Sequence, residues 1–421
     1  MSRGSTGRRL ARLTIATREL TGPRRTGQAA IALIFLVTAA VLRAHVLLAA
    51  GNDAPPAACA AHSAFTADVT VDVKAFGAHG NGVDDDSEAI GSAIASLDQG
   101  GTVVFPPGTY VHGDILTVRK ANVLLLGRQA ELHARNPNRA AVFLTGENSS
   151  IRGLAITSAP ADARGDRLEQ SGLVVSGTGN TVVANTVSGF KSAGVMVFGA
   201  RDYVIACNRV SDTKADGIHA THGALRGYVA GNSIFNTGDD GIAMVSYGSD
   251  WQASAITIEE NVVEHIRWGR GISVVGSRDA TIRRNRIKSV AMAAGILVAR
   301  EAFFHTPGAS HVTIHDNELI DIQRNLAPLN GSQRTGHAAI ELNSDSDDAA
   351  LAVSDVDVVG NRVDGAAYDG IRLLGNVCNV VISGNRLRDV GGRGIAVKDA
   401  CVNGFVRCAD NLVDGSSARC E

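Results

Sequence analysis

The stretch Asn236-Thr-Gly-Asp-Asp-Gly-Ile-Ala-Met244 contains a Gly-Ile pair that recurs along the chain, and this recurrence decides the fold. One repeat earlier the same frame reads Lys214-Ala-Asp-Gly-Ile-His219, so Asp216 and Asp240 stand one repeat apart. The aliphatic residue of the frame returns at similar intervals, at Val195, Ile218, Ile242, Ile272, Ile296, Ile371 and Ile395. A repeat of this length is typical of a solenoid, in which each repeat stacks on the next.

Each repeat holds at least two short strands. A second position tracks the first, an Asn followed two residues later by an aliphatic residue, at Asn208, Asn232, Asn285, Asn361 and Asn385. Tracts such as 271–275 and 280–284 alternate and are rich in β-branched residues, and no full repeat shows helical periodicity. The sequence therefore predicts an all-β fold, a parallel β-helix, in which the repeated Asn forms a turn ladder that bonds the backbone across coils.

Stacking places equivalent residues about 4.8 Å apart, so the repeats can be aligned as columns. The column after Gly is aliphatic throughout and is predicted to form the core: Leu173, Val195, Ile218, Ile242, Ile272, Ile296, Ile340, Ile371 and Ile395. The column two residues further on is also apolar, which fits side chains that point inward with a period of two. The residues between these columns, such as His219 and Ser273, are predicted to face outward.

The column just before Gly differs, because it collects charged residues: Ala193, Asp216, Asp240, Arg270, Ala294, Asp369 and Arg393. We expect Asp216 and Asp240 to be neighbours on adjacent coils, with Asp239 beside them and Arg270 on the next coil. Carboxylates this close raise one another's pKa, a cost that a purely structural column has no reason to carry. Asp216, Asp239 and Asp240 are therefore the candidate catalytic residues.

Residues 1–50 are predicted to be an export signal or a membrane anchor. Within them, the segment 1–27 carries seven Arg and one Glu, and an apolar run from Ala29 to Leu42 follows, as in export signals. That run is shorter than the roughly 20 residues of a membrane span, but continued past Arg43 to Ala50 it reaches that length, so a membrane tether stays open. In both cases we expect 51–68 to be a linker and 69–421 to be a single β-helix domain that is periplasmic, secreted or anchored to the envelope.

Charge and cysteine content restrict the partners. Without residues 1–50 the chain keeps 32 of its 40 basic and 41 of its 42 acidic residues, an excess of nine acidic residues that argues against nucleic acid as a partner.

Six cysteines suit disulfides in an oxidising compartment better than zinc, because none has C-x-x-C spacing. Four of them, Cys378, Cys401, Cys408 and Cys420, are expected to close the C-terminal coils. No metal and no cofactor are predicted for the favoured function.

The start of the predicted domain resembles a known superfamily. Residues 71–110 begin Val71-Asp-Val-Lys-Ala-Phe-Gly-Ala-His-Gly80 and end Gly100-Gly-Thr-Val-Val-Phe-Pro-Pro-Gly-Thr-Tyr110. This is similar to the opening of the pectate-lyase-like superfamily, which implies a right-handed parallel β-helix over nearly all of residues 69–415. Between the two motifs, Ser87 is a good N-cap for a helix over 87–98 with one apolar face, and we expect this helix to cap the open end of the solenoid.

Within that superfamily, the pattern of Asp216 with Asp239-Asp240 resembles two kinds of inverting glycoside hydrolase. These are the polygalacturonases and, with closer wording, the bacterial α-1,3-glucanases. The resemblance implies that Asp239 is the general acid and that Asp216 with Asp240 activates water, about 6.5 to 9.5 Å from the acid. Gly269-Arg-Gly271 stands where polygalacturonases have Gly-His-Gly, so the resemblance does not extend to galacturonate recognition.

Several repeats are longer than the rest, which indicates loops around the aspartates. The extra residues are 247–254, 301–310 and 344–354 after the strand and 325–337 before it. Loops on a rigid scaffold often carry binding residues. The candidate substrate-binding residues are His219, Arg270, Arg300, Tyr247 and Trp251, of which the last two could stack on sugar rings.

The sequence therefore predicts a secreted, inverting glycoside hydrolase that degrades a polysaccharide. One alternative is a polysaccharide lyase or uronate epimerase on the same fold, with Arg270 or Arg300 as charge neutraliser and calcium at the three aspartates. The other is a non-catalytic β-helix that binds glycans and uses the aspartates as turn caps.

Overall fold

The computed structural model describes residues 59, 69–248, 251–399, 401 and 404–421. The predicted export signal or anchor over 1–50 lies outside the described residues, as does the predicted linker over 51–68 apart from Cys59. Within the part of the chain that is described, no helix has the length and apolar character needed to cross a membrane.

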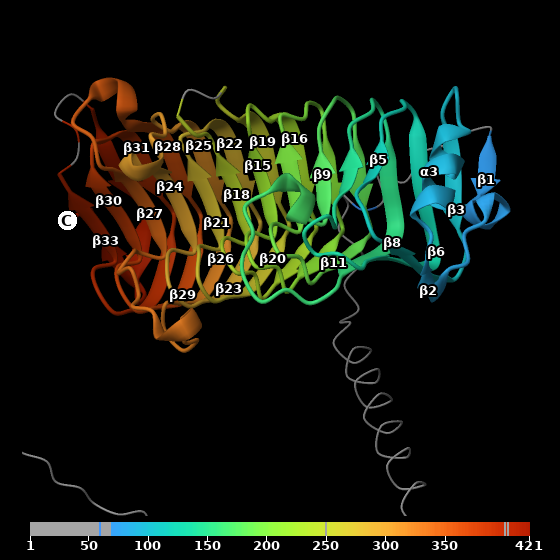
Figure 1. Cartoon of the computed structure of the whole chain (residues 1–421). Coiled ribbons are helices and arrows are strands. Elements are labelled where there is room, and N and C mark those ends of the chain that lie inside the picture. Colours follow the sequence, from blue (N-terminus) through green and yellow to red (C-terminus); the bar gives the residue numbers. More distant parts are fainter. Residues whose placement is uncertain (1–58, 60–68, 249–250, 400, 402–403) are drawn as a thin grey trace, which may run out of the picture. The chain divides into compact units, whose positions relative to one another are not determined.

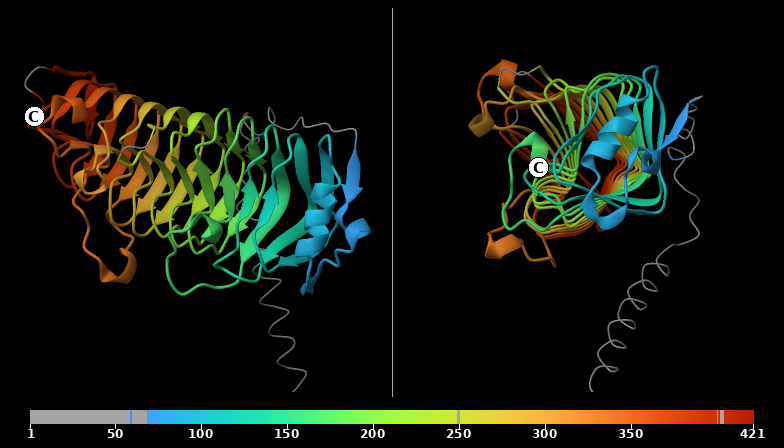
Figure 2. Two further views of the ribbon diagram at one scale, coloured as in Figure 1. Left: turned by 45° about the horizontal axis from the view of Figure 1, so that its top comes forward. Right: turned by 45° about the vertical axis from the view of Figure 1, so that its right-hand side comes forward.

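The described chain winds into stacked coils that run from β1 (Thr70–Asp72) to β36 (Ser416–Ala418), as Figures 1 and 2 show. One face is an 11-stranded parallel sheet, which we name the front sheet. Its strands are β5 (Leu116–Val118), β7 (Val142–Leu144), β9 (Leu173–Val175), β12 (Val195–Phe198), β15 (Ile218–Thr221), β18 (Ile242–Val245), β21 (Ile272–Val275), β24 (Ile296–Arg300), β27 (Ile340–Ser344), β30 (Ile371–Gly375) and β33 (Ile395–Lys398).

The remaining strands form two further columns, which the long strands β6 (Val123–Ala134) and β8 (Ser150–Ser158) join into one 25-stranded sheet. One column contains β1, β3 (Gly101–Phe105), β10 (Thr181–Val183), β13 (Val204–Ala206), β16 (Leu225–Ala230), β19 (Ser254–Glu259), β22 (Arg278–Arg283), β25 (Ser310–His315), β28 (Val353–Val359), β31 (Val377–Ser383) and β34 (Val406–Ala409). The other contains β2 (Asn81–Asp85), β4 (Gly108–His112), β11 (Thr186–Ser188), β14 (Arg209–Ser211), β17 (Ser233–Phe235), β20 (Val262–Ile266), β23 (Arg286–Val290), β26 (Glu318–Ile322), β29 (Arg362–Ala366), β32 (Arg386–Val390), β35 (Asn411–Val413) and β36. Coils pair in parallel, and β36 folds back antiparallel on β35.

The core is the predicted aliphatic column. In the front sheet Val195 pairs with Ile218, Ile218 with Ile242, and Ile242 with Ile272, and all four are buried. Burial of each such side chain contributes about 1.5–3 kcal/mol. The preceding glycine is required by close approach of the coils, because a Cβ on Gly217 would lie 2.6 Å from the carbonyl oxygen of Gly241.

The predicted asparagine ladder is confirmed and is longer than the five residues that suggested it. At each step the backbone N–H and the Nδ2 of one Asn donate to the Oδ1 of the next, and Nδ2 also donates to a carbonyl of the preceding coil. The ladder runs through Asn185, Asn208, Asn232, Asn261, Asn285, Asn317, Asn361, Asn385 and Asn411. It satisfies buried backbone groups at a turn where no strand partner is available.

The residues between the core columns face outward, as the alternation predicted, but several of them are not exposed to solvent. His219, Ser273 and Glu341 point away from the core, but all three are buried. Loops cover this outer surface of the front sheet, and Ala243, Val245, Val275, Ala294, Leu297 and Ala299 form a second apolar cluster on it. The loops contain the 3₁₀ turns η2 (Leu168–Gln170), η3 (Ala302–Phe304), η4 (Leu329–Gly331) and η5 (Ala349–Leu351).

Helix α3 (Ser87–Ala95) packs Ile90, Ala93 and Ile94 into the core at the N-terminal end of the solenoid, after the short turn η1 (Val73–Phe76) (Figure 1). It ends three residues before the expected boundary at 98. Ser87 is not the N-cap, which is Asp86; the Ser87 hydroxyl instead bonds Asp85 and accepts from the Gly113 N–H. The side chain of Asp86 is used elsewhere, since it accepts from the N–H groups of His79 and Gly80.

Three disulfides join all six cysteines. Cys378 pairs with Cys401 and Cys408 with Cys420, so the four C-terminal cysteines do close the last coils. The third disulfide joins Cys59 to Cys207, 148 residues apart.

Candidate active site

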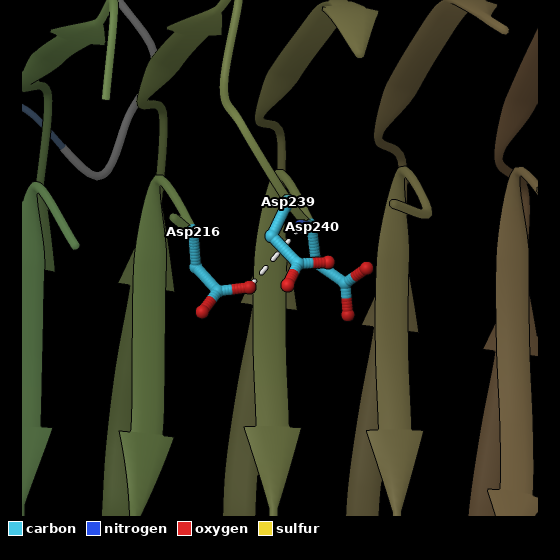
Figure 3. Close-up of side chains that lie close together, drawn as sticks. All are labelled: Asp216, Asp239 and Asp240. Carbon is cyan, nitrogen blue, oxygen red and sulfur yellow. Dashed lines mark hydrogen bonds between the residues drawn. The ribbon is translucent and has the colours of Figure 1, made fainter. Parts of the chain in front are cut away.

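Asp216 and Asp240 occupy the same position on adjacent coils, each two residues before the first residue of β15 or β18 (Figure 3). The Oδ1 of Asp216 accepts the backbone N–H of Asp240 at 3.1 Å. One coil further, the Oδ1 of Asp240 accepts the backbone N–H of Arg270 at 2.7 Å. Each carboxylate is therefore fixed to the backbone of the following coil.

The same bond occurs away from these residues. The Oδ1 of Asp369 accepts the backbone N–H of Arg393 at 2.7 Å, again from one coil to the next. An aspartate before the Gly-Ile pair therefore has a structural role of its own, even where no second aspartate stands at this position on an adjacent coil. Asp369 provides an internal reference for what this position does without a neighbouring acid pair.

Asp239 is different from the residues of that column. Its side chain is 19% exposed, and its Oδ2 forms an ion pair with the Nη1 of Arg164. Within the described part of the chain, this is the one hydrogen bond that its carboxylate accepts. The backbone of this turn is held by two hydrogen bonds, because the Asp239 N–H donates to the carbonyl of Ala215 and the Thr237 hydroxyl donates to the Asp239 carbonyl. Apart from the ion pair with Arg164, these contacts give the Asp239 carboxylate no structural role.

Asp216 is paired with a histidine. The Nδ1 of His219 lies 2.9 Å from the Oδ2 of Asp216, and both side chains are buried. Burial alone would raise the pKa of Asp216, but the charge and hydrogen bond of His219, with the charge of Arg164, lower it below its ordinary value. Burial alone would lower the pKa of His219, but Asp216 raises it. The two groups thus favour an ionised pair.

The other two aspartates shift in the opposite direction. Burial raises the pKa of Asp240 to about 7, and Asp239 and Asp216 add to this against the charge of Arg270 and the hydrogen bond from the Ser273 hydroxyl. Burial and the charge of Asp216 raise the pKa of Asp239 despite its contact with Arg164. One site therefore contains an ionised carboxylate beside carboxyl groups that hold a proton more readily.

A cavity of about 340 Å³ opens over the three aspartates. Its floor comes from the outward-facing residues of the front sheet, among them Met196, Phe198, His219, Ala243 and Val245. One wall is the loop before η2, which supplies Arg164, and the other contains Tyr247, Glu301 and Phe304. The cavity is thus largely apolar, with its charged groups gathered at the aspartates.

The predicted substrate-binding residues separate into two groups. His219, Arg270 and Tyr247 line the cavity. Arg300 does not, because its Nη1 lies 2.6 Å from the Oδ1 of Asp345 in an ion pair outside it. Trp251 is also outside the lining and is 77% exposed.

Sequence reasoning missed Arg164, Glu301 and Phe304. Glu301 lies 3.1 Å from the Nη2 of Arg270, so that Arg270 contacts acidic groups on both sides. Residues 301–310 are recognisable as an insertion, but nothing in their spacing indicates which side chains turn toward the aspartates. A signal for Arg164 does exist, since the coil from Ser150 to its partner Thr181 is longer than the next coil, from Thr181 to Val204.

The three acids converge on one point. One oxygen from each of Asp216, Asp239 and Asp240 lies within 4.8 Å of the others. This distance joins the nearest oxygens, whereas the roughly 6.5 to 9.5 Å typical of inverting enzymes separates the carboxyl groups. The three oxygens could surround a cation, but each carboxylate already contacts a positive group, namely His219, Arg164 or Arg270.

Comparisons with known proteins agree on the architecture. A family model described as a right-handed beta helix region matches residues 171–347. No curated protein matches the sequence. Similar solved structures include PfbA, a surface adhesin of Streptococcus pneumoniae (16% identity, TM-score 0.64, 82% of this chain and 91% of that one).

Two other similar structures are polysaccharide-processing enzymes. A hyperthermoactive exopolygalacturonase from Thermotoga maritima is 15% identical with a TM-score of 0.63, over 83% of this chain and 93% of that one. The catalytic unit of a GH87 α-1,3-glucanase from Streptomyces thermodiastaticus is 20% identical with a TM-score of 0.59, over 84% of this chain and 69% of that one. Likeness at such identities shows the fold and not the activity. The described chain is a right-handed parallel β-helix.

Proposed function

We propose that this chain is an exported glycoside hydrolase that acts on a polysaccharide. The observation that carries the proposal is the convergence of three carboxylates in one cavity, where Asp216 is held by His219 and Asp239 faces the cavity beside Arg164. Hydrolysis of a glycosidic bond needs a carboxylic acid to protonate the leaving oxygen and a carboxylate to assist the water or attack the sugar. The two kinds of group are adjacent here.

The proposed roles follow from the contacts. Asp239 is the general acid, because its pKa is raised and its carboxyl group is the most exposed of the three. Arg164 then stabilises the carboxylate that remains after the proton has moved to the leaving group. Asp216, held ionised by His219, is the base that activates water, and Asp240, whose pKa is raised, positions that water.

The stereochemical outcome is a separate question from hydrolysis. The resemblance to known hydrolases implies inversion, and the nearest carboxylate oxygens, within 4.8 Å of one another, are compatible with inversion or retention. The anomer released in the first minutes of reaction, read by proton NMR, decides between the two outcomes without affecting the proposal of hydrolysis.

Charge pairing favours hydrolysis over a lyase or epimerase. Those reactions remove a proton next to a carboxylate and need a positive group to neutralise the substrate's charge. Arg164 is paired with Asp239, Arg270 with Asp240 and Glu301, and Arg300 with Asp345. Each candidate cation is already neutralised by the protein, which suits an uncharged sugar at the point of cleavage.

Export is proposed from the N-terminal sequence together with the disulfides. The segment 1–50 has the composition of an export signal or membrane anchor. Three disulfides in a chain of this size are typical of an oxidising compartment.

The decisive test compares two isosteric variants. Asp239→Asn removes the proposed acid and is expected to lower kcat by about 10²-fold or more. Asp369→Asn makes the same change at the reference position, keeps an oxygen for the Arg393 N–H, and should leave kcat near that of the wild type. If the two variants have equal activity, the aspartates of the cavity are structural caps and the proposal is wrong.

The substrate is sought with a panel of neutral glucans, pectin, alginate and bacterial exopolysaccharides. Each digest is read for new reducing ends and for the absorbance of an unsaturated sugar, which only a lyase produces. Reducing ends without unsaturation are expected. Unsaturated product from any substrate would replace hydrolysis by elimination.

A further inference from the structure

Two adjacent phenylalanines stand at the mouth of the cavity. Phe303 and Phe304 belong to η3, in the loop that follows β24, and are 85% and 47% exposed. Phe304 also lines the cavity, so its ring lies where the cavity meets solvent. Exposed large apolar side chains that lie together on a surface commonly mark a site of interaction.

The loop that carries these rings is held in place. The Glu301 N–H donates to the Thr306 hydroxyl at 2.8 Å, and the Ala302 N–H donates to the Oδ2 of Asp345 at 3.0 Å. Asp345 is itself held by Arg300. A surface that is fixed before binding loses little conformational entropy when a ligand arrives. The Arg300–Asp345 ion pair, which lies outside the cavity, thus helps to fix this loop.

The aromatic groups form a continuous series from the cavity outward. The ring of Tyr247 lies edge to face with Phe304 at 5.9 Å between centroids, and Phe304 lies edge to face with Phe303 at 4.9 Å. Tyr247 in turn lies parallel to His219, the partner of Asp216, at 6.2 Å. The series therefore leads from the aspartates to the exposed face of Phe303.

We propose that Phe303 and Phe304 form a stacking subsite for a pyranose ring of the polysaccharide, outside the cavity and beyond the bond that is cleaved. This rests on the proposed function. A cavity of about 340 Å³ is at the small end of ligand cavities, so a polymer must continue beyond it, and Phe304 marks an exit. The C–H face of a sugar ring packs well on an aromatic ring. Two rings are too little surface for a stable protein partner, which needs about 800 Å² on each side.

The subsite is tested by affinity electrophoresis of the full chain in gels that contain laminarin, soluble starch, dextran, carboxymethylated α-1,3-glucan, xylan, pectin or alginate. All proteins carry Asp239→Asn so that the polysaccharide is not degraded. We expect retardation in at least one of these gels, about tenfold weaker when Phe303→Ala is added. Phe405→Ala, which removes an exposed phenylalanine of the C-terminal β34 region, is the matched control and should keep full retardation.

Each outcome is decisive for the subsite. No retardation in any gel, or equal retardation with Phe303→Ala, overturns it. A dimer of the Asp239→Asn protein in light scattering that Phe303→Ala converts to a monomer also overturns it, in favour of self-association. The proposed function is judged separately, from reducing ends released by the wild type, so either proposal can fail while the other stands.

Discussion

At the scale of single residues, the position before each Gly-Ile pair combines a structural bond with the proposed chemistry. Asp216, Asp240 and Asp369 all accept the backbone N–H of the next coil. The sequence was enough to predict that Asp216 and Asp240 are neighbours, because the repeat fixes columns. The longer coil from Ser150 to Thr181 indicates an insertion, but not that its Arg164 contacts Asp239, 75 residues away in the sequence.

The raised pKa of Asp240 has a consequence for stability. Its value moves from 3.8 to about 7, so the folded protein holds a proton that the unfolded chain releases between these values. This group therefore stabilises the fold fully below pH 3.8, and its contribution is lost as the pH rises toward 7. Asp240→Asn does not titrate, and its Tm should fall less than that of the wild type between pH 4 and pH 6.5. That range stays below the region where His219, whose pKa is raised, loses its own contribution.

The control for this measurement is Asp369→Asn, which leaves the three cavity carboxylates in place and should keep the wild-type change of Tm with pH. A wild-type slope in Asp240→Asn would contradict the assignment of the bound proton to Asp240.

At the scale of elements, the asparagine ladder fixes the turn between the two columns of the 25-stranded sheet. The sequence indicated its position because the Asn recurs in step with the Gly-Ile pair. The same pattern, an aliphatic residue two positions after the Asn, also stands at Asn185, Asn261, Asn317 and Asn411, so the sequence contains the full extent of the ladder. The cooperative unit is the stack, because each amide is both donor and acceptor to its neighbours.

Removal of one amide from the middle of the ladder should be costly. Asn285→Ala removes the acceptor of the Asn261 N–H and the donor to the carbonyl of Ile258, both buried. Each orphaned group costs about 1–3 kcal/mol. The free energy of unfolding, measured by urea denaturation, is expected to fall by at least that amount. Asn343→Ala, on the outward side of β27, is the control and should change it by less than about 0.5 kcal/mol. Equal effects of the two changes would show that the ladder adds no stability.

At the scale of the whole solenoid, each coil contacts mainly its neighbours, so stability is local along the axis. The repeat alone predicted the architecture and the core columns, because both depend on the period. The burial of His219 and Glu341 did not follow from the repeat, since it depends on how loops of irregular length lie over the front sheet. The burial of the outer surface of the front sheet is therefore determined by the loops and cannot be predicted from the repeat.

The C-terminal coils should depend on their disulfides more than the central coils do. A double variant, Cys408→Ser with Cys420→Ser, removes the link between β34 and the last residues of the chain. Hydrogen exchange measured by mass spectrometry is expected to become faster in β34 and β35, with β15 and β18 unchanged. Faster exchange spread evenly over all coils would show instead that the solenoid unfolds as one unit.

Asp216 and Asp240 are each bonded to the backbone of the next coil. The distance between their carboxylates is therefore set by the spacing of the coils and not by side-chain packing. Ala193 and Ala294 occupy the same column, and the carbonyls of the glycines that follow them accept the same bond from the preceding coil as those of Gly217 and Gly241. The fold therefore fixes the distance between positions of this column, whichever residues occupy them. Exchange of alanine and aspartate within the column would place an acid pair on other coils. During evolution the acids could thus come to lie beside different loops, with the distance between them unchanged.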